Sequence, residues 1–221
     1  MPQAIGIFTA LFKREGYILD LFDCTYYQDI DSINLGKNTT DEKIKNKQVR
    51  SHDNSEWQKK GVKPKIGIKE DFVKKVQEFK PDLIFCSVLE STYFLSLQLL
   101  DSVPNKDRNY KILFGGVFAT FASEICIKNE LIDYVCRGEG ENSLIELCKR
   151  FCKGEPTYNI PNFWVRHNGS ITKNKMSLLA DLESAPLPDY SLFPKHAINR
   201  AMQGKIRRTI GLETQRGCTF S

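Results

Sequence analysis

The chain has 221 residues, 41% of them hydrophobic, and a formal net charge of +5. That is enough apolar material for one α/β domain of ordinary size with an additional segment. There is no signal peptide and no apolar run of about 18 residues, so we expect a cytoplasmic protein without a membrane span. Its seven cysteines are then expected to be reduced thiols.

The first elements are a predicted helix at residues 4–15 and a predicted strand at residues 17–24. Apolar residues recur at helical spacing in the first segment, and Gly16 follows as a helix stop. A doubly wound sheet starts with its central strand, whereas this chain starts with a helix. We therefore expect the first strand of the sheet to be missing.

A long polar insertion is predicted at residues 29–65, with a short helix near 41–47. The excess positive charge is concentrated in its Lys-rich part, residues 37–65. This part lacks interleaved aromatic residues and any recognisable nucleic-acid-binding module, which favours a solvated insertion over a nucleic-acid-binding segment. An amphipathic helix at 70–79 follows and is closed by Pro81.

The middle of the chain alternates short apolar runs with amphipathic segments, which is typical of a parallel α/β sheet with right-handed crossovers. The fold class that this pattern predicts is a flavodoxin- or Rossmann-like sheet. Strands are expected at 82–86, 110–114 and 132–136, and helices at 92–102, 118–128 and 143–152.

The last part of the chain departs from this alternation. We expect a β-hairpin at 162–173 with Asn168-Gly169 as its turn, a Pro- and Asp-rich linker at 178–194, and a new strand at 208–214. The predicted organisation is an α/β domain at 1–154, a hairpin and linker at 155–207, and the truncated start of a further domain at 208–221.

Small residues follow two neighbouring strands of the predicted sheet. Ser87-Val88-Leu89 comes after one strand and Gly115-Gly116 after the next. The glycines leave bare backbone, and the helix start beyond them offers unpaired N–H groups, which suits a ligand with a flat aromatic or sugar-phosphate tail. The alternative is a tight strand-to-helix turn in which Ser87 is only a cap.

Two further places have chemical interest. Gly138 and Glu139 stand in a loop that either lines the same crevice or only opens the next helix, where the helix dipole stabilises acidic residues. Cys218 lies in a Gly-containing loop beside Arg216. Thiolates in such loops ligate iron–sulfur clusters, but a cluster needs three or four of them, so Cys218 by itself is a free thiol.

Several of these elements together resemble the amino-terminal half of B12-binding radical S-adenosylmethionine (SAM) proteins, over nearly the whole chain. The matching elements are Ser87-Val88-Leu89 (SxL), Gly115-Gly116 (GG), the loop Gly138 to Glu141, the Asn-Phe-Trp hairpin, the linker with Pro186-Leu187-Pro188-Asp189-Tyr190, and Gln215 to Ser221, which looks like the start of a CxxxCxxC loop.

The resemblance implies a cobalamin-binding site and, in the full-length protein only, a [4Fe–4S] cluster with SAM. Cys218 would be the first cluster ligand. The cofactor-binding residues carried over by the motifs are Ser87, Val88, Leu89, Gly115, Gly116, Val117, Gly138 and Glu139. The implied reaction is methyl transfer or related radical chemistry on an unidentified substrate, and this part alone is expected to be inactive.

The DxHxxG motif, which in many cobalamin domains supplies a histidine to cobalt, does not occur here. Many radical SAM members also lack it, so the lower ligand of cobalt stays open. Two other functions remain: a cobalamin-free scaffold or docking domain of a radical SAM protein, and a free-standing corrinoid carrier.

Overall fold

The computed structural model describes residues 2–27, 29, 54–63, 65–177, 179–181, 183, 185–202, 205–211 and 216. The chain divides into two compact units, one made of residues 69–181 and the other of residues 1–68 together with 182–221. Each unit is described by itself.

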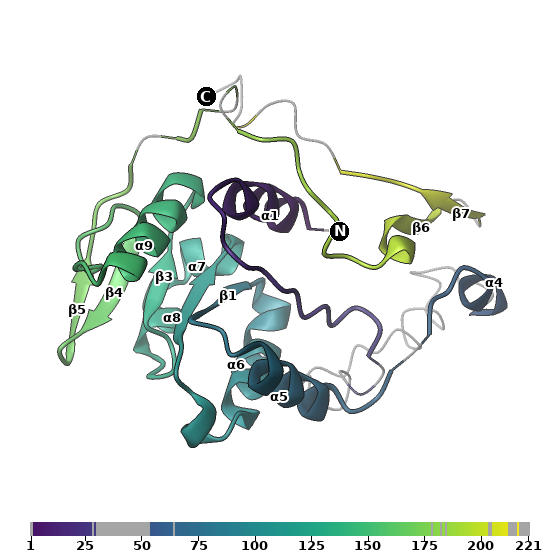
Figure 1. Ribbon diagram of the computed structural model, residues 1–221, viewed down its shortest axis with the longest axis horizontal. Coiled ribbons are helices and arrows are strands. Elements are labelled where there is room, and N and C mark those ends of the chain that lie inside the picture. The colour runs from purple at the N-terminus through teal and green to yellow at the C-terminus, as the bar shows by residue number, and fades with distance from the viewer. Residues whose placement is uncertain are drawn as a thin grey trace. The chain divides into compact units, whose positions relative to one another are not determined.

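The unit 69–181 is built on a five-stranded sheet in the order β1-β2-β3-β4-β5. The first three strands are parallel, β4 is antiparallel to β3, and β5 is antiparallel to β4 (Figure 1). Their bounds are β1 Leu83–Ser87, β2 Lys111–Gly115, β3 Tyr134–Cys136, β4 Phe163–His167 and β5 Ser170–Lys173. The prediction of a Rossmann-like α/β sheet followed by a hairpin is confirmed.

Helices precede, connect and follow the parallel strands. They are α5 Ile68–Phe79, which begins at the boundary of the unit, α6 Glu90–Ser102, the 3-10 helix η1 Asn105–Asp107, α7 Val117–Phe121, α8 Ser123–Lys128 and α9 Glu141–Lys153. None of the helices in the described ranges is both long and apolar enough to cross a membrane.

The single helix predicted at 118–128 is wrong, because the segment is broken at Ala122 into α7 and α8. The Ser123 hydroxyl donates to the carbonyl oxygens of Ala119 (2.8 Å) and Thr120 (3.0 Å). A serine that bonds back to the preceding turn competes with backbone hydrogen bonding and bends a helix. The break leaves α7 as little more than one turn beside the end of β2.

The core of this unit lies where the sheet meets its helices. Leu113 and Phe114 in β2 and Val135 in β3 have no exposed surface, and Leu144 of α9 is equally buried. Each such side chain contributes about 1.5–3 kcal/mol of hydrophobic stabilisation. The apolar runs recognised in the sequence are therefore the strands that hold the sheet at the centre of the unit.

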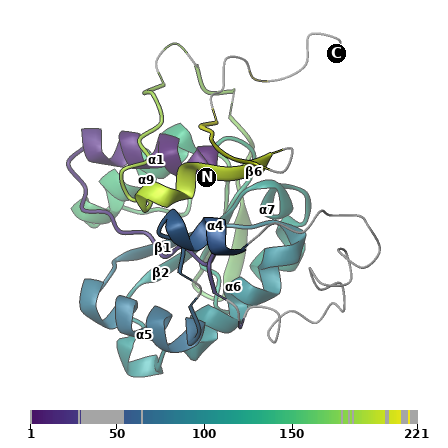
Figure 2. The same ribbon diagram turned by 90° about the vertical axis from the view of Figure 1, so that its right-hand side faces the viewer.

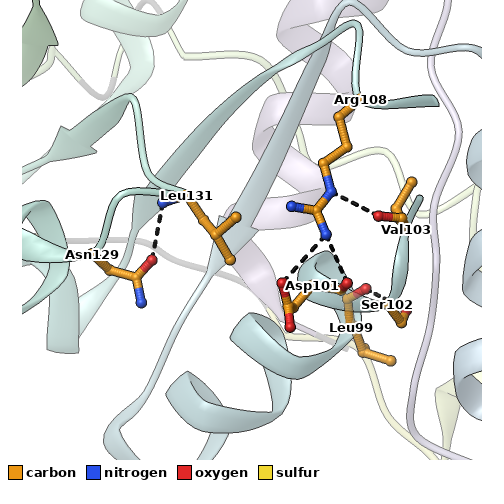
Figure 3. A network of polar contacts seen from close by, with 7 residues as sticks. All are labelled: Leu99, Asp101, Ser102, Val103, Arg108, Asn129 and Leu131. Atoms are coloured by element: carbon orange, nitrogen blue, oxygen red, sulfur yellow. Dashed lines mark hydrogen bonds and ion pairs between the residues drawn. The ribbon is translucent and has the colours of Figure 1, made fainter. Parts of the chain in front are cut away.

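The loops at the amino ends of β2 and β3 are fixed by polar side chains (Figure 3). Arg108 donates from Nε to the carbonyl of Val103 (2.7 Å) and from Nη2 to the carbonyl of Asp101 (2.7 Å). The Asn129 side chain accepts from the Leu131 N–H at 3.0 Å. These bonds satisfy carbonyls left free at the end of α6 and shape the turn before β3.

The hairpin has the predicted turn, with Asn168 at φ +49° and Gly169 at φ +73°. The sequence did not indicate its place in the sheet. Trp164 of β4 pairs with Val135 of β3, so the hairpin extends the parallel strands on their far side. The predicted Pro- and Asp-rich linker at 178–194 follows β5, the last strand of this sheet.

The other unit contains α1 Gln3–Arg14, α4 Asn54–Lys59, the 3-10 helix η2 Lys195–Ile198 and an antiparallel pair, β6 Asn199–Met202 and β7 Lys205–Arg208. The predicted first helix is confirmed. The predicted insertion helix at 41–47 lies outside the described residues, as does Cys218.

Two predicted strands are wrong in this unit. Residues 17–24 form no strand, because a strand needs a hydrogen-bonded neighbour and none of the described strands pairs with this segment. The strand expected at 208–214 is displaced: β7 ends at Arg208, residues 209–211 have no regular structure, and residues 212–214 lie outside the described part.

The linker residues from Pro188 to Ser191, which belong to the same unit, contact α1 (Figure 1, Figure 2). The Asp189 N–H donates to the carbonyl of Gly6 at 2.9 Å, and Lys13 donates to the Asp189 carboxylate at 2.8 Å. A Cβ at Gly6 would lie 2.7 Å from the Tyr190 ring. The Pro-Leu-Pro-Asp-Tyr motif therefore serves as a packing partner of the first helix.

Candidate functional site

The carboxyl ends of β1 and β2 lie side by side at one edge of the sheet. The two strands are parallel, and Ser87 pairs in register with Gly115. The loops that follow, with Val88-Leu89 on one strand and Gly116-Val117 on the next, therefore leave the sheet at the same level. This is the place at which open α/β sheets bind ligands.

Val88 joins these two loops through its backbone. Its N–H donates to the carbonyl of Gly115 (2.8 Å), and its carbonyl accepts from the Phe118 N–H (3.2 Å). Its side chain is 1% exposed. Val88 therefore fixes the position of the loops, and its side chain is turned into the core.

The two glycines are required by contacts inside the protein. A Cβ at Gly115 would lie 2.8 Å from the ring of Phe85. A Cβ at Gly116 would lie 3.0 Å from the Val88 carbonyl oxygen and 3.1 Å from the Ser87 hydroxyl, and Gly116 has φ +91°. The Gly-Gly pair thus permits close approach of the loops whether or not a ligand is present.

Exposed side chains at this edge are suited to an apolar ligand surface. Leu89 is 54% exposed and Val117 is 61% exposed, and the Ser87 side chain is exposed between the two loops. Apolar surface left in water costs roughly 25 cal/mol per Å². A flat group laid here would cover these side chains and find a hydroxyl beside them.

The third loop, after β3, contacts other parts of the protein. The Gly138 N–H donates to the Thr120 hydroxyl (3.0 Å), and a Cβ at Gly138 would lie 2.7 Å from the Met176 methyl group. The Glu139 carboxylate accepts from the Ala180 N–H. Gly138 and Glu139 therefore hold the segment that leaves the hairpin.

Asn162 is the residue of this region whose role the sequence did not reveal. It is 4% exposed and has φ +69°. Its Nδ2 donates to the Glu139 carbonyl (2.7 Å), and its Oδ1 accepts from the Ser177 N–H (2.7 Å). Asparagine tolerates positive φ, so its place directly before a strand was the one sequence feature that could have indicated this role.

Two buried thiols of this unit, Cys126 and Cys136, are not poised for chemistry. Burial, with a smaller contribution from the Glu141 carboxylate, raises the pKa of Cys136 to about 12. Burial raises the pKa of Cys126 to about 11. Both stay protonated at neutral pH, whereas thiolates are the reactive and metal-binding form. Within the described ranges, no three His, Cys, Asp or Glu residues are grouped to hold a metal ion.

Comparison with known protein families matches the part of the chain that forms this edge. A family model described as "B12 binding domain" matches residues 29–148, more than half of the chain, and this range contains both Ser87 and Gly116. The match includes β1, β2, β3 and the loops that follow them.

Two curated proteins are similar to this chain. An uncharacterized methyltransferase of Pyrococcus horikoshii is 26% identical over 155 residues, covering 68% of this chain and 32% of that protein. The 4′-phospho-dehydrooxetanocin synthase of Priestia megaterium is 25% identical over 154 residues, covering 67% of this chain and 20% of that protein. The chain thus spans about a third or less of the length of these relatives.

A solved structure has a similar fold. The radical SAM methyltransferase TsrM from Kitasatospora setae, with cobalamin and a [4Fe–4S] cluster bound, has a TM-score of 0.53 at 15% identity, covering 85% of this chain and 28% of that one. The resemblance that the SxL and GG motifs indicated is confirmed by the family match: this chain belongs to the B12 binding domain family.

Proposed function

We propose that this chain is the cobalamin-binding portion of a radical SAM enzyme, and that the cofactor lies at the carboxyl ends of β1 and β2. The observation that carries the proposal is that the B12 binding domain match includes β1 and β2. The carboxyl ends of these two strands stand in register, with Ser87 opposite Gly115. The edge offers a hydroxyl, exposed apolar side chains and glycine backbone within two adjoining loops.

In this proposal the residues divide into two groups. Ser87, Leu89 and Val117 contact the cofactor tail, with the backbone of Gly116 between them. Val88, Gly115, Gly138 and Glu139 set the shape of the edge through their contacts with neighbouring segments. When bound, cobalamin supplies a cobalt ion able to carry and transfer an alkyl group.

The activity of the longer protein is also a proposal. The names of the relatives, a methyltransferase and an oxetanocin-type synthase, and the cluster and cobalamin in TsrM support methyl transfer or related radical chemistry. In that protein Cys218 would be the first thiolate ligand of a [4Fe–4S] cluster that binds SAM. The substrate is not identified by any residue of this chain, and the cytoplasmic location stays a prediction.

A visible-absorbance titration of hydroxocobalamin into the 221-residue chain tests the proposal. We expect saturable binding by the wild type. Val117→Glu should weaken it by about tenfold or more, because the cofactor would bury an unpaired carboxylate. Val117 starts α7, where a negative charge suits the helix dipole, so this variant should fold normally.

Ile125→Glu is the matched control. Ile125 is 56% exposed, close to the 61% of Val117, and also lies in the first turn of a helix. The affinity of the Ile125→Glu variant for hydroxocobalamin should equal that of the wild type. Absence of saturable binding by a wild-type chain with normal circular dichroism would remove cobalamin from the function of this chain.

The second candidate is a cobalamin-free scaffold domain. It is favoured by the finding that contacts inside the protein already account for Gly115, Gly116, Gly138 and Glu139. A scaffold would keep these residues for folding alone. The same titration separates the two functions, because a scaffold would bind no cobalamin and would not respond to the Val117 substitution.

A further inference from the structure

The Thr120 hydroxyl connects the loops that follow β2 and β3. It lies 2.9 Å from the Gly116 carbonyl oxygen and 3.0 Å from the Gly138 nitrogen. A backbone N–H can only donate and a carbonyl can only accept, so the single hydroxyl hydrogen points to Gly116 and the oxygen accepts from Gly138. Both hydrogen-bonding functions of the hydroxyl are thus used.

This connection lies beyond the end of the sheet ladder. β2 and β3 pair at only two positions, Leu113 with Tyr134 and Phe114 with Val135. No ladder pair joins the strands after that point. Beyond the carboxyl ends of the two strands, the Thr120 hydroxyl connects the turn at Gly138 to the turn at Gly116, because it makes a described hydrogen bond with each.

The loop after β3 is held from its other side as well. Asn162 donates to the Glu139 carbonyl, and the Met176 methyl group covers Gly138. These contacts bind the loop to the segment that leaves the hairpin, whereas Thr120 binds it to the edge formed by β1 and β2. Without the hydroxyl, the loop would follow the hairpin segment instead of the candidate cofactor edge.

From this geometry we propose that Thr120 is a positioning residue for the cofactor edge: it keeps the Gly138 turn at a fixed distance from Gly116 and Val117, so that the three loops present one surface to cobalamin. The inference rests on the proposed function, but its structural part concerns the chain without cofactor. Thr120 is in α7, one helical turn after Gly116, and does not itself need to contact the cofactor.

The test compares Thr120→Val and Thr120→Ser with a control at Thr9. Valine keeps the shape of threonine and removes the hydroxyl, and serine restores the hydroxyl. Thr9→Val is the matched change, because Thr9 also donates to the carbonyl four residues earlier (Ile5, 2.7 Å) and has no second hydrogen bond described. Thr9 lies in α1, in the other unit.

Two readouts are measured on the 221-residue chain. Amide NMR without cofactor should show exchange of the Gly138 N–H about tenfold faster in Thr120→Val than in the wild type, Thr120→Ser and Thr9→Val. The hydroxocobalamin titration should show about fivefold weaker binding by Thr120→Val alone, because the cofactor would have to order a loop that the hydroxyl no longer holds.

The two readouts separate the possible failures. Unchanged Gly138 exchange in Thr120→Val would overturn the inference even if cobalamin binds. Faster exchange with unchanged affinity would also overturn it, because the position of the loop would then not matter to the cofactor. No binding by the folded wild type would overturn the proposed function, and the positioning role with it, whereas the exchange data would still stand as a result on the loop.

Discussion

Gly116 illustrates how one residue determines the shape of the candidate edge. Its φ of +91° lies in a region that side chains rarely adopt, and a Cβ there would also press on the backbone of Val88. The hydrogen bonds of Val88 to Gly115 and Phe118 depend on this close approach. The site thus requires glycine for two independent reasons, backbone conformation and space.

Gly116→Ala should lower the free energy of unfolding by about 3 kcal/mol, from strain and steric pressure together. Gly154→Ala is the control. Gly154 also has positive φ (+66°), but nothing lies within 4 Å of its Cβ position, so only the conformational cost of about 1 kcal/mol applies. Urea unfolding followed by circular dichroism measures both, and equal losses would mean that the contact with Val88 has no energetic role.

At the scale of elements, the main finding is how segments far apart in the sequence are joined. Helix α1 holds the linker by the Gly6 carbonyl and by Lys13, which bonds Asp189 and Ser191. Hydrogen bonds from Lys13 and then from Ser191 lower the pKa of Asp189 to about 2. Because the folded state holds the carboxylate in its charged form, this contact stabilises the unit only while Asp189 is ionised.

The sign of the pH dependence follows from the lowered pKa. The contribution of Asp189 is complete above its ordinary pKa of 3.8 and is lost as the pH falls toward about 2. The Lys13–Asp189 pair is partly exposed, so it contributes at most about 1 kcal/mol to the free energy of unfolding, and this contribution falls with increasing salt. Asp189→Asn should therefore be slightly less stable than the wild type at pH 7, and the difference should shrink below pH 4.

The measurement is urea unfolding of wild type, Asp189→Asn, Lys13→Met and the double variant at pH 7 and near pH 3. The coupling between the two positions should be present at pH 7 and reduced near pH 3. A coupling that does not change between the two pH values would show that the ion pair is not the source of the stabilisation.

At the scale of the whole molecule, the proposed cofactor site lies within the chain, whereas Cys218 would supply only one of the thiolates that a cluster needs. Iron–sulfur clusters need three or four thiolates, and Cys218 is the only cysteine of the segment Gln215 to Ser221. The curated relatives are about three times as long or more. In the proposed radical SAM enzyme, Cys218 would therefore need further thiolate ligands to hold a cluster.

The 221-residue chain, reconstituted with iron and sulfide and incubated with SAM and dithionite, should therefore form no 5′-deoxyadenosine above a control without protein. Chromatography with mass detection measures the product. The hydroxocobalamin titration of the same preparation shows that the protein is folded and competent to bind. Product formed in proportion to the amount of protein would contradict the expectation that this chain by itself has no radical SAM activity.

Several features of this protein could be predicted from the sequence because they depend on local patterns. The apolar runs at 82–86 and 110–114 and the alternation with helices identify parallel strands, observed one residue later at 83–87 and 111–115, and parallel strands place Ser87 and Gly115 at the same edge. The Asn168-Gly169 turn predicts a hairpin for the same local reason. The SxL and GG motifs, combined with the Gly138 loop, the hairpin, the linker and the segment around Cys218, indicated the family.

The remaining features depend on contacts between distant residues. Residues 17–24 have the composition of a strand but pair with none of the described strands, and the hairpin joins the sheet through a pairing of Trp164 with Val135. Thr120 and Asn162 are ordinary polar residues in the sequence. The sequence by itself determined the three parallel strands and the residues that stand at their carboxyl edge. Only the tertiary structure decided which of them hold the loops in place, because hydrogen bonds across loops depend on positions in space that no local pattern encodes.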